Sequence, residues 1–194
     1  MEHQIKALFK RKNFSEDIFH RFQREKSGCI DDIYDGQLYK EFVESGFLSE
    51  ENKFNISFTL NTDGVPVFKS SKTSMWPVFF AVNELPIKMR FKKNHMLLGG
   101  IWFGGKPLHN LMLEPFLNTF RTLKRGIQVE LFESERKYLS RAILLAWTAD
   151  LPAKADLMGI KHTSGSHSCL YCKIEGKSVK TGSVKITLSG KFFS

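Results

Sequence analysis

Residues 54–64 read FNISFTLNTDG, an alternation of apolar and polar residues that ends in an acid and a glycine. Successive side chains of an extended chain point to opposite faces, so the alternation predicts a β-strand with one apolar and one polar face. Gly64 opens a Gly/Pro turn, which places Asp63 at the end of the predicted strand. The stretch is therefore expected to present a carboxylate where a strand gives way to a turn.

A second predicted strand also runs into an acid. Residues 138–148 are almost continuously apolar, as expected of a strand buried on both faces, and Asp150 follows two residues later. Residues 152–158 then predict a short helix with Asp150 near its N-terminal cap. Hard cations such as Mg²⁺ and Mn²⁺ prefer carboxylate oxygens. Asp63 and Asp150 are therefore candidate catalytic residues that would hold Mg²⁺ or Mn²⁺ together.

Each acid also has a purely structural explanation. An Asp before a Gly is common in turns, which accounts for Asp63 without any chemistry. An Asp in front of Leu-Pro is a usual helix N-cap, which accounts for Asp150 in the same way. A shared metal site requires the two acids to converge from different elements of the fold.

The order of the predicted elements favours one fold. The first region is helical: Ser15 is expected to cap one helix, and Gly46 is expected to end another. After the first strand, the pattern predicts an edge strand from Val65-Pro66, strands over 76–82 and 96–103, a helix over about 110–124 with Pro115 near its first turn, a strand over 127–132, and the strand and helix around Asp150. This is the order of the first half of an RNase H-like fold, in which the first and fourth strands lie side by side.

The expected fold class is therefore α/β. We expect an incomplete RNase H-like core, with a mixed sheet and flanking helices, preceded by a short helical region. The predicted organisation is a helical lead-in over residues 1–50, a partial catalytic core over 54–158, and a Cys/His segment with a truncated tail over 159–194.

Composition and charge point to a globular protein with a polyanionic partner. The chain has 194 residues, is 42% hydrophobic and carries a formal net charge of +9. That length allows one domain with a real core, and the positive charge favours nucleic acid. Between Pro86 and Arg125 there are eight Lys or Arg residues against the single acid Glu114. The structural alternative is a set of solvated surface lysines.

A cysteine pair follows the second acid. Cys169 and Cys172 have the C-x-x-C spacing of zinc sites, and His162 and His167 lie just upstream. Thiolate and imidazole suit tetrahedral Zn²⁺, so these four residues are candidate zinc ligands. The alternative is a pair of reduced cysteines near a turn.

The N-terminal residues are polar, and no run approaches the roughly 18 apolar residues of a membrane span. We therefore expect an intracellular protein with reduced thiols and no membrane partner.

Several short motifs surround the two acids in a combination that is more specific than any one of them. They are residues 61–71 (NTDGVPVFKSS), Trp76-Pro77, residues 83–86 (NELP), Arg90, residues 149–153 (ADLPA), Gly159, and the pattern His162-x-x-Gly165-x-x-x-Cys169-x-x-Cys172. Over roughly residues 33–172 the chain resembles the catalytic core of transposases from CACTA (En/Spm-type) DNA transposons.

This resemblance implies a DDE/D-type enzyme with an RNase H-like core that cuts and joins DNA with a divalent metal. The first and second acids of the family map onto Asp63 and Asp150, and its cysteine pair maps onto Cys169 and Cys172. The third acid of the family lies on a later helix, which is absent from these 194 residues. We therefore expect the chain to be incomplete and to lack full strand-transfer activity alone.

We therefore expect DNA at transposon ends as the partner and the nucleus as the compartment. A homo-oligomer is compatible with the sequence, which leaves the oligomeric state open. A different reading is a non-catalytic module that binds nucleic acid or protein and retains the fold and the zinc site without the chemistry.

Overall fold

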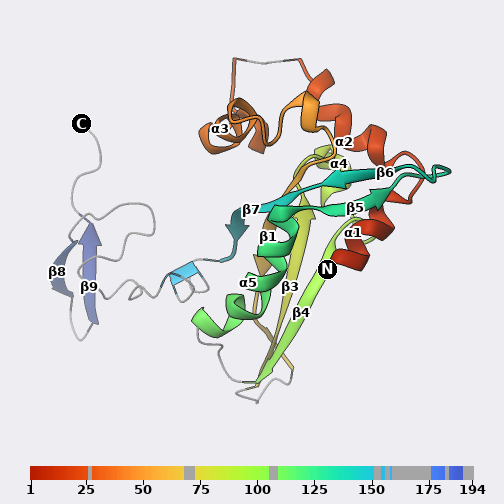
Figure 1. The fold of residues 1–194 in the computed structure, drawn as a ribbon. Helices are drawn as coiled ribbons and strands as arrows, with labels where there is room; N and C mark the ends of the chain where they lie inside the picture. The colour runs from red at the N-terminus through yellow and green to blue at the C-terminus, as the bar shows by residue number, and fades with distance from the viewer. Residues whose placement is uncertain are drawn as a thin grey trace. The chain divides into compact units, whose positions relative to one another are not determined.

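A computed structural model describes residues 1–25, 28–67, 73–104, 109–150, 154–155, 158, 176–181 and 184–189 (Figure 1). The chain divides into two compact units. Unit 1 comprises residues 1–62, 77–101 and 115–148, and unit 2 comprises residues 63–76, 102–114 and 149–194. Unit 1 contains the helical region and most of the central sheet.

The central sheet has five strands and mixed direction. Its members are β1 (Ile56–Thr62), β2 (Val65–Pro66), β3 (Ser74–Val82), β4 (Leu97–Gly104) and β7 (Ala142–Thr148). The order is β2-β3-β1-β7, and β4 also pairs with β3. β1 runs antiparallel to β3 and parallel to β7. The predicted neighbourhood of the first strand and the strand before Asp150 is therefore confirmed, as is the α/β class with a mixed sheet.

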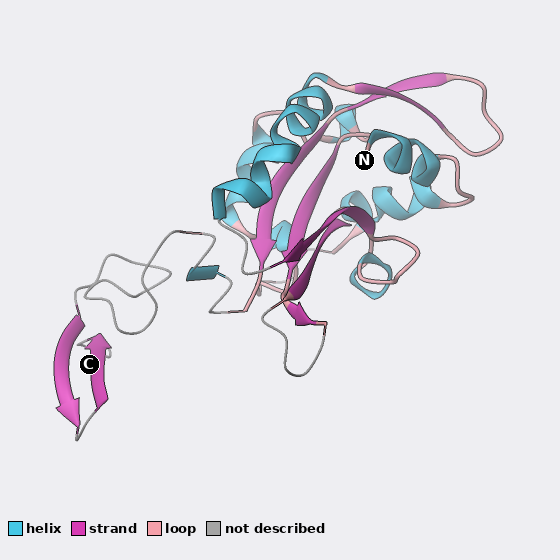
Figure 2. Cartoon of the chain, turned by 90° about the horizontal axis from the view of Figure 1, so that it is seen from below, coloured by secondary structure: helices cyan, strands magenta, loops and turns pink. Residues whose placement is uncertain are grey.

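Helices flank the sheet (Figure 2). They are α1 (Glu2–Phe9), α2 (Phe14–Gln23), α3 (Gln37–Glu44), α4 (Ile87–Arg90) and α5 (His109–Arg125), with short 3₁₀ turns η1 (Ile33–Asp35) and η2 (Glu50–Asn52). Two hairpins complete the described chain: β5 (Ile127–Glu130) with β6 (Lys137–Ser140), and β8 (Gly176–Thr181) with β9 (Val184–Ser189). None of the described helices is long and apolar enough to cross a membrane.

An aromatic cluster joins α5 to one face of the sheet. The Phe80 ring of β3 lies 6.0 Å from the Phe58 ring of β1, and 5.5 and 5.8 Å from Phe116 and Phe120 of α5. These edge-to-face contacts and the burial of the rings stabilise the layer, at about 1.5–3 kcal/mol for each fully buried side chain. Gly99 of β4 lies against the same rings, so the helix and the strand approach closely there.

Both faces of β1 are buried, although its sequence predicts one polar face. Ser57 and Thr59 are buried beside the buried apolar residues Phe58 and Leu60. Asn83 and Glu84 cover this polar face, because Glu84 accepts from Ser57 and Asn83 accepts from Thr59, and Tyr39 of α3 donates to Glu84 in turn. The polar side chains of β1 must therefore find partners inside the protein.

The predicted helix start at Ser15 is wrong. α2 begins at Phe14, so Ser15 is its second residue, and Asn13 takes the capping position with a positive φ of 65°. Phe14 is buried against the Phe9 ring, with centroids 5.1 Å apart, and this packing draws the helix start forward. The second helix is confirmed: α3 ends at Glu44, and Gly46 has the positive φ typical of a helix stop.

The single strand predicted over residues 138–148 is wrong. It is two strands that separate at Arg141, because β6 pairs with β5 and β7 pairs with β1. Arg141 donates its backbone N–H to Asn55 Oδ1 at 2.9 Å, and its carbonyl accepts from the Ile56 N–H at 2.9 Å. Side-chain capture by Asn55 therefore fixes the change of partner. Most of β7 is half-buried and not fully covered.

The helix predicted over about 110–124 is confirmed as α5, but Pro115 lies in its second turn. Gly126 follows the helix with a φ of 114°, as expected of a helix stop. Of the helix predicted over 152–158, only residues 154, 155 and 158 lie within the described part of the chain.

The close approach at Gly99 gives a stability test with a neighbouring control. A Cβ at Gly99 would lie 2.4 Å from Phe80 Cε2 and 2.9 Å from Phe116 Cε1, whereas one at Gly100 would meet nothing nearer than 3.7 Å. Gly99→Ala should lower the free energy of unfolding by about 1–3 kcal/mol through overpacking. Gly100→Ala should change it by less than about 1 kcal/mol. Urea denaturation of both variants checks this, and equal effects would contradict the packing.

Candidate functional site

The ends of β1 and β7 lie side by side. The two strands are parallel, and their last paired residues are Asn61 and Thr148. Asn61 Nδ2 donates to the Thr148 carbonyl at 3.2 Å and to its hydroxyl Oγ1 at 3.0 Å. Asp63 lies two residues after Asn61, and Asp150 lies two residues after Thr148. Both acids are exposed. Each acid therefore follows, in sequence, the end of one of two adjacent strands.

The turn after β1 is set by an aromatic ring. A Cβ at Gly64 would lie 2.5 Å from Cζ2 of Trp76, so only glycine fits between β1 and β2 there. Packing therefore explains Gly64. It does not explain Asp63, whose side chain makes no hydrogen bond or ion pair within the described residues. A turn-forming Asp would normally bond to nearby backbone.

The backbone at Asp150 fits the predicted helix N-cap. The Lys154 N–H donates to the Asp150 carbonyl at 2.8 Å, which is the bond of a first α-helical turn. The backbone of Asp150 is therefore compatible with a helix N-cap. Asp150 is also exposed.

The described residues around the two acids offer few other metal ligands. Two exposed carboxylates suit Mg²⁺ or Mn²⁺. Within the described ranges, no group of three or more His, Cys, Asp or Glu residues could hold a metal ion. The hollow of about 420 Å³ along β7 is lined by Leu144, Leu145, Ala146 and Trp147, which offer no ligand.

The predicted zinc ligands lie outside the described residues. They are His162, His167, Cys169 and Cys172. The zinc site therefore stays a prediction.

A buried carboxylate organises the polar face of β1. Glu84, which follows β3, has no exposed surface. Its Oε2 accepts from the Ser57 backbone N–H at 2.7 Å, and its Oε1 accepts from the Ser57 hydroxyl at 2.8 Å and the Tyr39 hydroxyl at 3.3 Å. Arg21 Nη1 lies 3.4 Å from Oε1. Burial raises the pKa of Glu84, and the nearby guanidinium opposes that shift.

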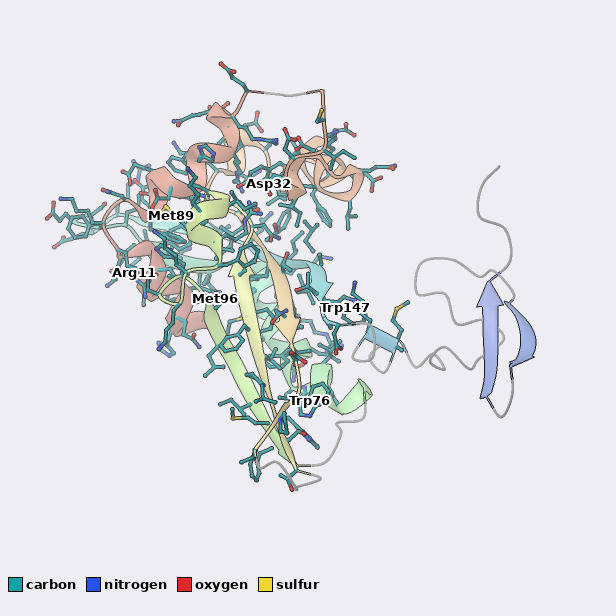
Figure 3. The ribbon with its side chains drawn as sticks, turned by 180° about the vertical axis from the view of Figure 1, so that it is seen from behind. Arg11, Asp32, Trp76, Met89, Met96 and Trp147 are labelled. Carbon is teal, nitrogen blue, oxygen red and sulfur yellow. The ribbon has the colours of Figure 1, made fainter. Side chains whose placement is uncertain are left out.

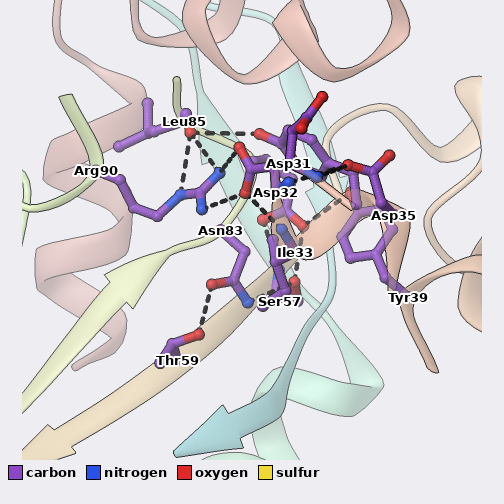
Figure 4. Close-up of polar contacts among 12 residues, drawn as sticks. Asp31, Asp32, Ile33, Asp35, Tyr39, Ser57, Thr59, Asn83, Leu85 and Arg90 are labelled. Atoms are coloured by element: carbon purple, nitrogen blue, oxygen red, sulfur yellow. Dashed lines mark hydrogen bonds and ion pairs between the residues drawn. The ribbon is translucent and has the colours of Figure 1, made fainter. Parts of the chain in front are cut away.

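Asn83 extends this network along β1. Its Oδ1 accepts from the Thr59 hydroxyl at 2.7 Å, and its Nδ2 donates to the Ser57 hydroxyl at 3.0 Å (Figure 4). Its backbone N–H donates to the Ser57 carbonyl at 2.9 Å. Asn83 and Glu84 therefore continue the contact between β1 and β3 past the last strand pair, Phe58 with Val82.

Two further arginine–aspartate pairs hold the segment around η1. Arg90 is buried and donates to both carboxylate oxygens of Asp32, at 2.6 and 3.0 Å (Figure 4). Arg24 donates in the same way to Asp35, at 2.8 Å for each bond. Such paired bonds are the strong form of an ion pair.

Asn83, Glu84 and Arg90 belong to the sequence motifs, but the sequence predicted no role for them. Polar residues after an apolar strand also fit an ordinary solvated turn, so the sequence did not indicate that Asn83 and Glu84 are buried. Arg21 carried no signal, since its partner Glu84 is distant in the sequence.

A family model described as transposase family tnp2 matches residues 28–192. This chain belongs to the tnp2 transposase family. The matched region contains both strand-end acids, the Asn83–Arg90 segment and the Cys/His segment, so the resemblance to transposases is confirmed. Searches of curated proteins and of solved structures returned no match.

Glu84→Gln tests the network at the heart of this tnp2 protein. It leaves the Arg21 guanidinium buried without a negative partner, which should lower the free energy of unfolding by about 3–5 kcal/mol. Glu44→Gln, on the exposed surface of α3, removes the same charge and should change stability by no more than about 0.5 kcal/mol. Chemical denaturation gives both values. Similar small losses in the two variants would show that Glu84 does not support the fold.

The ion pair of Asp35 should make the stability of the folded protein depend on pH in acid. Arg24, together with the backbone N–H groups of Asp31 and Asp32, holds the pKa of Asp35 well below its ordinary value. A carboxyl with a lowered folded-state pKa stabilises the protein above its unfolded pKa of about 4 and loses that contribution as pH falls further. The melting temperature of Asp35→Asn should therefore fall less than that of the parent protein as the pH is lowered from about 4 to 2. Parallel melting curves against pH would contradict this pairing.

Proposed function

We propose that this protein is a CACTA (En/Spm-type) transposase in which Asp63 and Asp150 hold a divalent metal for DDE/D-type cleavage and joining of DNA. The observation that carries the proposal is the parallel pairing of β1 with β7, closed at its end by the Asn61–Thr148 hydrogen bonds. Two acids that are 87 residues apart in sequence thereby follow adjacent strand ends.

The proposed roles follow from ligand chemistry. Asp63 and Asp150 supply carboxylate oxygens from two separate elements, as a shared metal site requires. Bound Mg²⁺ or Mn²⁺ would activate a water or a 3′-hydroxyl and offset negative charge on the phosphate. Asn61 would act as a positioning residue, because its side chain ties the two strand ends together.

The proposed substrate is DNA at transposon ends, and the proposed compartment is the nucleus. The tnp2 family match and the net charge of +9 support a DNA partner. Cys169, Cys172, His162 and His167 would form a zinc site that has a structural role. A DDE/D site uses three acids, and Asp63 and Asp150 are the two for which we propose a role.

Metal titration tests the site directly. Isothermal titration calorimetry with Mn²⁺ should show that Asp63→Asn and Asp150→Asn each weaken binding at least tenfold, which is about 1.4 kcal/mol. Glu51→Gln, which removes an exposed charge on η2, should leave the affinity unchanged. Unaltered Mn²⁺ affinity in both aspartate variants would end the shared-site proposal.

A cleavage assay separates the remaining outcomes. The full chain is incubated with Mn²⁺ and a duplex that carries a transposon terminal repeat. Cleavage that Asp63→Asn abolishes would keep the site and overturn the expected incompleteness. DNA binding with no Mn²⁺ affinity would favour the non-catalytic binding module.

A further inference from the structure

The segment after β3 exposes apolar and basic side chains together. Ile87 and Phe91 lie one helical turn apart on α4 and its C-terminal end, and are 56% and 58% exposed. Lys88, Lys92 and Lys93 alternate with them and are also exposed. Solvation explains exposed lysines, but it does not explain two large exposed apolar side chains between them.

Buried contacts fix the backbone of this segment. Arg90, in the middle of it, is buried and bonds to Asp32 and to the Leu85 carbonyl, at 3.1 and 3.2 Å for the latter. The Arg90 guanidinium also lies 5.3 Å from the centre of the Tyr34 ring. His95 Nδ1 lies 3.0 Å from the Met89 carbonyl and closes the other end. The exposed side chains are therefore presented on a fixed backbone.

The loop between α1 and α2 adds further positive charge. Arg11 donates from Nη1 to the Asn94 carbonyl, which places this loop beside the α4 segment (Figure 3). Lys12 is exposed next to it. We name the combined surface the α4 patch. Its members are Arg11, Lys12, Ile87, Lys88, Phe91, Lys92 and Lys93.

The charges of the α4 patch are mostly uncompensated. Its four lysines form no ion pair with any residue that the structure describes. Glu16 and Asp17 follow the loop at the start of α2, and burial raises the pKa of Asp17. Glu84 precedes the α4 segment, but it is fully buried beside Arg21. Residues 11–17 and 84–93 thus contain five patch cations and, apart from the buried Glu84, two acids. The patch has a net positive charge and an apolar centre.

We infer that the α4 patch binds double-stranded DNA, with its cations on backbone phosphates and Phe91 against the sugars or base edges. Charge complementarity with a polyanion carries the choice of partner, and apolar side chains beside cations are a common means of holding DNA. The inference rests on the proposal that this transposase acts on DNA.

The α4 patch is a site distinct from the strand-end acids. α4 follows the end of β3, and β3 runs antiparallel to β1. The patch therefore lies at the opposite end of these strands from the paired ends of β1 and β7. It would hold a length of duplex other than the one that is cut.

Salt dependence of DNA binding gives the test. Each phosphate contact contributes a slope of about −0.9 to a plot of log affinity against log salt. The variant Lys88→Gln/Lys92→Gln/Lys93→Gln should therefore reduce the slope by about 2–3 and lower affinity at least tenfold. The measurement is fluorescence anisotropy of the full chain with a duplex in 50–200 mM NaCl. Phe91→Ala should weaken binding without changing the slope.

The matched control removes three exposed lysines from other elements. Lys40→Gln/Lys124→Gln/Lys137→Gln produces the same net charge and should change the slope by less than one. Equal effects of the two triple variants, with the parent protein still binding DNA, would overturn the α4 patch and leave the metal-site proposal standing. Tighter binding of the parent to anionic vesicles than to duplex DNA would also overturn it.

A footprint keeps the test independent of variant folding. Acetylation of the unmodified chain, read by mass spectrometry, should show Lys88, Lys92 and Lys93 protected by duplex DNA and Lys40 unprotected. Equal modification with and without DNA would contradict the inference. Neither readout depends on Mn²⁺ binding, so each proposal can fail separately.

Discussion

The rest of the structure depends on a carboxylate that has no contact with water. Glu84 is fully buried, and an ionised group in that position is tolerated only when every lone pair finds a donor. Ser57 of β1 and Tyr39 of α3 donate hydrogen bonds to it, and Arg21 of α2 supplies the opposite charge. One side chain therefore joins three elements that are far apart in the sequence. Because the bond to the Ser57 N–H is specific, the network favours a single placement of β1 against the end of β3.

Strand pairing connects the position of β1 to the candidate site. β1 lies between β3 and β7, and it pairs with β7 in a parallel register that shifts between Phe58 and Thr59. The register ends at Asn61 and Thr148, and the two acids follow immediately. We infer that the buried polar network and the two exposed acids are linked through the sheet. The network stabilises the sheet, and its strands β1 and β7 precede Asp63 and Asp150. The tnp2 family match covers β1, β7 and Glu84, but Arg21 precedes it.

Sequence patterns predicted the sheet better than its surroundings. Alternation located β1, and the order of elements placed β7 beside it, because both depend on local periodicity and a known connectivity. The break at Arg141 was missed, since it depends on capture by Asn55, 86 residues away. The start of α2 was missed because Phe14 packs on Phe9. The acids Asp63 and Asp150 were visible as strand-end residues, whereas the partners of Glu84 were not, because buried polar pairs leave no periodic trace. The predicted zinc ligands lie outside the described residues, so that prediction is not tested.

A crystal structure of the full chain soaked in Mn²⁺, with anomalous scattering data, would test the central claim most directly. The account predicts an anomalous peak bound by carboxylate oxygens of both Asp63 and Asp150, at the end of the β1–β7 pair. A structure in which the two carboxylates are too far apart to share a metal ion, or in which Mn²⁺ binds elsewhere, would contradict it.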